Sequence, residues 1–131
     1  MSNSQKKILV VDDENSIRSM LVIAFENKGY QVDSASNGNE AWELMNTNHY
    51  DLLTTDLYMP EMNGIELIFT CQEPFPETKT ILLSAGGKDL DAEHGNQYVK
   101  FLDQEIKIDM FLKKPCELNE MLSVVERLLQ E

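Results

Sequence analysis

The sequence is poor in arginine, and it has no apolar run long enough to span a bilayer. Arg18 and Arg127 are its only arginines, and 23 acidic residues against 11 basic ones give a net charge of −12. Proteins that bind nucleic acid neutralise its phosphates with clustered lysine and arginine. We therefore expect neither direct binding to nucleic acid nor a membrane-spanning segment.

Cysteine is also scarce, since the chain has only Cys71 and Cys116, which lack metal-ligand spacing and are too few for a disulfide framework. We expect free thiols in a reducing cytoplasm. Residues 1–6 are polar, contain no apolar signal core, and are expected to form a flexible N-terminus. Because no linker, repeat or low-complexity segment divides the chain, we expect one domain over residues 1–131 and no effector domain.

Short predicted strands alternate with amphipathic helices along the chain. The strands are expected at residues 7–11, 31–35, 52–55, 80–83 and 110–113, and most of them are continuous apolar runs. Each is followed by apolar residues at the three- and four-residue spacing of a helix. This order predicts an α/β fold with a five-stranded parallel sheet, helices on both faces and right-handed connections.

Several helix ends can be predicted from single residues. Gly29 is expected to follow the end of the first helix as its C′ residue. Asn37 with Glu40, and Asn63 with Glu66, have the spacing of capping boxes at the starts of two later helices.

The stretch after the fourth strand is less regular. Residues 85–97 contain three glycines and several charges, which predicts a long loop. The spacing of four apolar residues that follow predicts one face of a helix, formed by Tyr98, Phe101, Leu102 and Ile106.

The chain is organised around the buried strand that ends at Asp56. Pro60 cannot continue a strand ladder, so the strand ends before it, and the Asn63 cap starts a helix soon afterwards. Strand, loop and helix therefore place the Asp56 carboxylate at the carboxyl edge of the sheet, where open α/β sheets bind ligands.

Polar residues follow other strands at the same point. Asp12 and Asp13 follow the first strand, Ser84 ends the fourth, and Lys114 follows the fifth. Three crowded carboxylates need a compensating cation, and oxygen ligands suit Mg²⁺. A cation, a lysine and a hydroxyl together can receive a phosphoryl group, with an aspartate as its nucleophile.

Each of these residues also has an ordinary structural interpretation. Asp12, Asp13 and Glu14 would favour the positive end of the first helix dipole without binding a metal. Ser84 would be a hydroxyl at a strand end, and Lys114 a solvated lysine. Each interpretation is reasonable for one residue, but the coincidence at four strand ends favours a shared site.

These motifs resemble the receiver domain of bacterial two-component response regulators. The resemblance rests on Asp-Asp-Glu after the first strand, on Asp56 followed by Met-Pro-Glu-Met-Asn-Gly, on Ser84-Ala85 and on Lys114-Pro115. It covers essentially the whole chain, and it implies a flavodoxin-like fold and a stand-alone receiver similar to chemotaxis regulators.

The resemblance implies a role for each motif residue. Asp56 would accept a phosphoryl group from a histidine kinase or phosphotransfer protein. Mg²⁺ would be held by Asp12, partly through water, by Asp13 and Asp56, and by the backbone carbonyl of Tyr58. Lys114 would pair with the phosphoryl oxygens.

The resemblance also implies a conformational switch. Ser84 and Ala85 would bind the phosphoryl group, and Phe111 would change rotamer as Ser84 moves. A cis peptide bond is expected between Lys114 and Pro115. The glycines and charges of residues 86–96 predict the most mobile internal segment, which would read out the switch to an unknown downstream protein.

Three departures from the family pattern stand out. The segment from Ser84 to Lys114 is longer than usual for the family, the aromatic position is Phe111 and not tyrosine, and Cys116 follows Lys-Pro where phenylalanine is common. The resemblance implies a phosphoacceptor rather than an enzyme, with at most weak self-phosphorylation from small donors and weak autodephosphorylation.

Three other functions compete with this interpretation. A phosphatase with an aspartate nucleophile usually has a second aspartate two residues later, where this chain has Tyr58. A flavin or nucleotide protein of this fold would offer a phosphate-binding loop after the first strand, where Asp12 and Asp13 repel phosphate. A receiver-like docking module that is never phosphorylated remains compatible with the sequence.

Overall fold

The computed structural model describes residues 6–84, 98–101, 104–114 and 116–130. Its central sheet is parallel, with the order β2-β1-β3-β4-β7. The strands are β1 (Lys7–Val11), β2 (Gln31–Ala35), β3 (Leu52–Asp56), β4 (Lys79–Ser84) and β7 (Met110–Lys113). The predicted five-stranded parallel sheet is confirmed.

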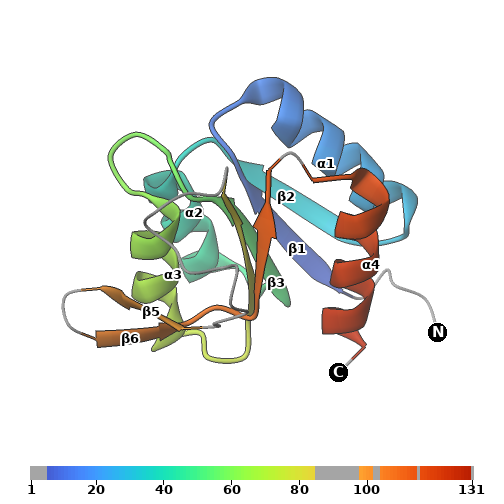
Figure 1. Ribbon diagram of the computed structural model, residues 1–131. Helices are drawn as coiled ribbons and strands as arrows, with labels where there is room; N and C mark the ends of the chain where they lie inside the picture. Colours follow the sequence, from blue (N-terminus) through green and yellow to red (C-terminus); the bar gives the residue numbers. More distant parts are fainter. Residues whose placement is uncertain (1–5, 85–97, 102–103, 115, 131) are drawn as a thin grey trace.

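Helices cover both faces of the sheet (Figure 1). One face carries α1 (Asn15–Asn27) and α4 (Leu118–Leu129), and the other carries α2 (Gly38–Thr47) and α3 (Gly64–Gln72). Each face has its own hydrophobic core, because successive strand residues point to opposite sides. Leu53 therefore packs in the cluster under α2 and α3, whereas its neighbour Leu52 packs in the cluster under α1 and α4.

One predicted capping box is complete and the other is half formed. At the start of α3, the Asn63 side chain accepts from the Glu66 amide, and the Glu66 side chain accepts from the Asn63 amide. At the start of α2, Asn37 accepts from the Glu40 amide, but the Glu40 carboxylate accepts instead from the Ser36 amide.

The predicted helical face at residues 98–106 is wrong. Strands β5 (Tyr98–Phe101) and β6 (Gln104–Lys107) form an antiparallel hairpin, separate from the main sheet and lying against α3. Tyrosine, valine, phenylalanine and isoleucine in this segment all favour strands. Ile106 is fully buried in the cluster beneath α2 and α3, so packing against α3 supports the hairpin.

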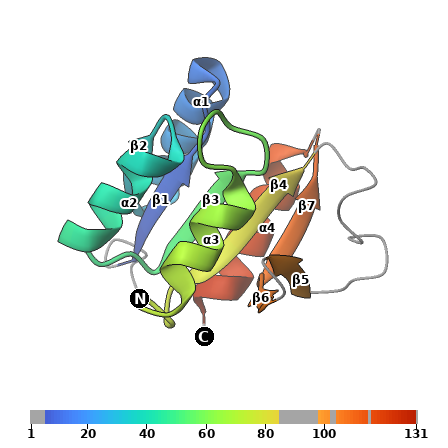
Figure 2. The same ribbon diagram turned by 90° about the vertical axis from the view of Figure 1, so that its left-hand side faces the viewer.

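The fold brings the carboxyl ends of the central strands to one edge, at the top of the sheet in Figure 1. Figure 2 shows α2 and α3 side by side, with the loop between β3 and α3 at this same edge. Two predictions concern the chain that follows Ser84, namely the long loop at residues 85–97 and the mobile switch segment at residues 86–96. Both lie outside the described residues.

Candidate functional site

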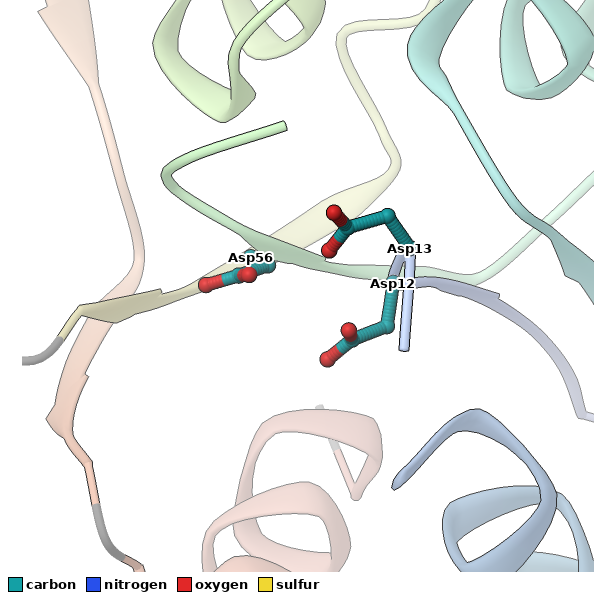
Figure 3. A group of neighbouring side chains, drawn as sticks. All are labelled: Asp12, Asp13 and Asp56. Atoms are coloured by element: carbon teal, nitrogen blue, oxygen red, sulfur yellow. The ribbon is translucent and has the colours of Figure 1, made fainter. Parts of the chain in front are cut away.

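Three carboxylates meet at the carboxyl edge of the sheet (Figure 3). Asp12 and Asp13 directly follow β1, and Asp56 is the last residue of β3, which pairs with β1. Each residue offers one carboxylate oxygen, and these oxygens lie within 4.8 Å of one another. Asp12 and Asp56 are buried, whereas Asp13 is exposed, so the cluster is open to solvent on the Asp13 side.

The two carboxylate oxygens of Asp12 have different surroundings. Oδ1 accepts a hydrogen bond from the Glu14 amide at 2.9 Å, as expected of a residue beside a helix start. Oδ2 is buried, finds no hydrogen-bond partner in the described part of the chain, and lies 3.7 Å from Lys114 Nζ. A buried, unsatisfied carboxylate oxygen is costly. Oδ2 is therefore a ready ligand for a cation.

Lys114 directly follows β7, the edge strand that pairs with β4, and its side chain reaches the cluster from there. Its backbone amide donates to the Ser84 carbonyl at 2.6 Å, which fixes the chain just after β7. Its Nζ lies 3.1 Å from Asp56 Oδ1. This contact brings together two of the strand-end residues that the sequence groups at one edge of the sheet.

Burial and neighbouring charges shift the pKa of both partners of this ion pair. Burial raises the pKa of Asp56, the hydrogen bond and charge of Lys114 oppose that rise, and the Asp12 and Asp13 charges add to it, so the pKa is raised. Burial lowers the pKa of Lys114, but its hydrogen bond to Asp56 and the nearby acidic charges outweigh burial, so this pKa is raised as well. Lys114 is therefore firmly protonated, yet it does not fully offset the cost of charging Asp56.

The site fits a hard divalent cation. Among the described residues it offers several carboxylate oxygens, one of them buried without a hydrogen-bond partner, and the Lys114 ammonium lies within 4 Å of two of the three clustered carboxylates. Mg²⁺ prefers oxygen ligands and commonly uses one or two carboxylates together with water and phosphate oxygens. The donor set, and not the mere presence of acidic residues, supports this fit.

The remaining predicted residues lie around the cluster. Ser84 is buried at the end of β4, next to Lys113 in the sheet register. Phe111 pairs with Leu82 and packs partly buried against the core beneath α2 and α3. The Tyr58 side chain is exposed just after the end of β3. Ala85 and the predicted cis bond before Pro115 lie outside the described residues.

Two further residues support the site and were not predicted from the sequence. Arg18 donates through Nη1 to the Asp12 carbonyl at 2.8 Å and through Nη2 to Asn15, one helical turn before it. The three-residue spacing of Asn15 and Arg18, one helical turn, could have indicated that these two side chains interact. At Gly64, an added Cβ would lie 2.3 Å from the Asp56 carbonyl oxygen, so only glycine allows α3 to start so close to the end of β3.

Among the helices of the described residues, none combines the length and the apolar character needed to cross a lipid bilayer.

Comparison with known proteins identifies related sequences. A family model described as the response regulator receiver domain matches residues 8–126. The transcriptional regulatory protein SrrA of Staphylococcus aureus is 35% identical over 130 residues, which are 99% of this chain and 49% of the relative. The chain thus spans about half the length of the curated relatives that it matches.

Solved structures resemble the fold. The Vibrio cholerae chemotaxis protein CheY4 matches with a TM-score of 0.79 and 25% identity, covering 94% of this chain and 98% of that one. The receiver domain of the Francisella response regulator 1452 matches with a TM-score of 0.79 and 29% identity, covering 96% and 98%. Thermotoga maritima TrrA, solved in complex with Mg²⁺–BeF, matches with a TM-score of 0.76 and 29% identity, covering 95% and 99%.

Proposed function

The chain belongs to the response regulator receiver domain family, and from this premise we propose that Asp56 accepts a phosphoryl group from a histidine kinase or phosphotransfer protein. Receiver domains are the phosphoacceptor signalling domains of two-component phosphorelays and not conventional enzymes. They interact with histidine kinases and with downstream effectors. For this chain we propose which residue is the nucleophile, which residues bind Mg²⁺ and which residues form the switch.

One observation carries the assignment of Asp56. Its buried carboxylate lies 3.1 Å from Lys114 Nζ and shares a cluster with the carboxylates of Asp12 and Asp13. An Asp56 oxygen would attack phosphorus, forming an O–P bond as the N–P bond of the donor phosphohistidine breaks. The departing imidazole nitrogen would keep the electron pair of that bond and take up a proton. Lys114 would then pair with a phosphoryl oxygen.

The acidic residues would hold Mg²⁺ beside the reacting group. Asp13 and Asp56 would be ligands, with Asp12 acting partly through water, and the backbone carbonyl of Tyr58 would complete the protein's contribution. When bound, the metal would offset the negative charge of the phosphoryl oxygens and of the carboxylates. The Mg²⁺–BeF complex of the related Thermotoga protein supports this choice of cation.

Phosphorylation would be read out through the ends of β4 and β7. The Ser84 hydroxyl and Ala85 would bind the phosphoryl group, and Phe111 would change rotamer as Ser84 moves toward Asp56. Ser84 and Phe111 lie on adjacent paired strands, which supports such a coupling. The altered surface would then bind a downstream protein. We also propose weak phosphorylation from small donors and weak autodephosphorylation.

A receiver-like docking module that is never phosphorylated is the remaining alternative. The contact between Lys114 and Asp56 disfavours it, because a docking surface needs no such ion pair within an acidic cluster. A phosphatase is disfavoured because Tyr58 stands where a phosphatase with an aspartate nucleophile usually has its second aspartate.

Acetyl phosphate with Mg²⁺, followed by intact mass spectrometry, tests the proposal. The wild type should gain one phosphoryl group, and Asp56→Asn should gain none, because a neutral amide is a far weaker nucleophile than a carboxylate. Asp51→Asn is the matched control, since Asp51 precedes β3 at its opposite end, and it should be labelled like the wild type. Equal labelling of Asp56→Asn would refute the assignment, and no labelling of the folded wild type would favour the docking module.

A further inference from the structure

The loop of residues 57–63, between β3 and α3, lies against the start of α2 at the edge of the sheet that carries the acidic cluster (Figure 2). Backbone hydrogen bonds fix both ends of this loop. The Leu57 amide donates to the Leu83 carbonyl at 2.8 Å, and the Gly64 amide donates to the Leu57 carbonyl at 2.8 Å. Leu57 and Met59 are buried on either side of Tyr58. Residues 60–62 form the outer part of the loop.

The backbone of this outer part is strained. Glu61 has φ of 72°, and it is the only non-glycine residue with a positive φ among the described residues. Such a conformation is unfavourable for a residue with a Cβ and persists where surrounding contacts impose it. One such contact comes from α2, because Asn39 Nδ2 donates to Glu61 Oε1 at 3.1 Å.

A second contact is tighter. An added Cβ at Gly38, the first residue of α2, would lie 2.8 Å from both the Cβ and the Sδ of Met62. The sulfur could rotate away, but the Met62 Cβ is attached directly to the loop backbone. A larger residue at position 38 must therefore displace the loop itself. Gly38 is buried, and Met62 packs partly buried against the core, which leaves little room for either element to yield.

We propose that Gly38 and Asn39 are positioning residues for the metal site. They hold Met62 and Glu61, and the loop in turn fixes the backbone at Tyr58, whose carbonyl would be a Mg²⁺ ligand. This inference rests on the proposed function, because it takes the Tyr58 carbonyl as a ligand. It adds that the start of α2, which contributes no ligand itself, sets the affinity of the site.

Mg²⁺ affinity, measured by isothermal titration calorimetry on the full chain, tests this inference through a double-mutant cycle. Gly38→Ala should weaken Mg²⁺ binding by about tenfold, the lower end of what loss of a ligand-orienting contact typically costs. The same change in a Met62→Gly background should alter affinity by less than about twofold, since the opposing Cβ is gone. If Gly38 had a merely structural role, Gly38→Ala would lower the melting temperature but leave the Mg²⁺ affinity of the folded protein unchanged.

Two further variants serve as control and second probe. Gly29 follows α1 with φ of 97°, as predicted for a C′ glycine, so Gly29→Ala should lower the melting temperature but leave Mg²⁺ affinity unchanged. Asn39→Ala should weaken Mg²⁺ binding by about threefold while the chain stays folded, because the bond it removes is exposed. It keeps the test decisive if Gly38→Ala fails to fold.

Unchanged Mg²⁺ affinity in both Gly38→Ala and Asn39→Ala would overturn the inference while leaving the metal site intact. An equal loss of affinity from Gly38→Ala with and without Met62 would overturn it too, because the loss would then not pass through the loop. If the folded wild type binds no Mg²⁺, the proposed metal site is itself refuted, and the inference fails with it.

Discussion

At the scale of the residue, the charge balance around Asp56 decides what the site can do. Lys114 Nζ lies 3.1 Å from Asp56 and 3.7 Å from Asp12, so one ammonium is shared between two buried carboxylates. Asp13 adds a third carboxylate to the cluster. Like charges at this separation disfavour one another's ionised form. A divalent cation would relieve that repulsion, and the stability of the fold should therefore depend on Mg²⁺.

We predict that Mg²⁺ raises the melting temperature of the wild type. Ligand that binds only the folded state adds about 2.7 kcal/mol to the free energy of unfolding at a hundred times its Kd. Asp13→Ala should lose most of that gain, because it removes a ligand from the exposed side of the site. Differential scanning calorimetry with and without Mg²⁺ measures both effects.

Glu43→Ala is the matched control, since it removes one exposed acidic side chain from α2 outside the cluster. It should keep the full Mg²⁺ gain. If the folded wild type melts at the same temperature with saturating Mg²⁺, or if Asp13→Ala and Glu43→Ala respond alike, the shared acidic site is contradicted.

At the scale of the element, strand ends and helix caps were predictable because their signals are local. The buried run that ends at Asp56, followed by Asn63 and Glu66, defines β3 and the start of α3. The hairpin of β5 and β6 was not predictable in this way. Tyr98 and Phe101 have the spacing of a helical face and also favour strands, and the outcome depends on contact with α3, far away in sequence.

The capping box of α3 should contribute measurably to stability. We predict that Asn63→Ala lowers the free energy of unfolding by about 1 kcal/mol, because the Glu66 amide loses its acceptor. Asn63→Asp keeps a side-chain oxygen and should lose much less. Urea unfolding followed by circular dichroism compares them, and an equal loss in both variants would show that the cap does not stabilise the helix.

At the scale of the whole molecule, the order of the strands creates the site. The parallel sheet places β1 beside β3 and β7 beside β4, so that Asp12, Asp56 and Lys114 meet although they are distant in sequence. The family's strand-end motifs made this convergence predictable. The contact of Gly38 with Met62 was not predictable, because the distance between these two residues is set only when α2 packs against the loop.

The central claim is that Asp56 carries the phosphoryl group, and locating the modified residue tests it most directly. The wild type, phosphorylated with acetyl phosphate and Mg²⁺, is reduced with borohydride, which converts an acyl phosphate to an alcohol and so marks the labelled aspartate as homoserine. Digestion and tandem mass spectrometry should find homoserine at position 56 and aspartate at positions 12, 13 and 51. Homoserine at any of these other positions, with aspartate retained at position 56, would contradict the account.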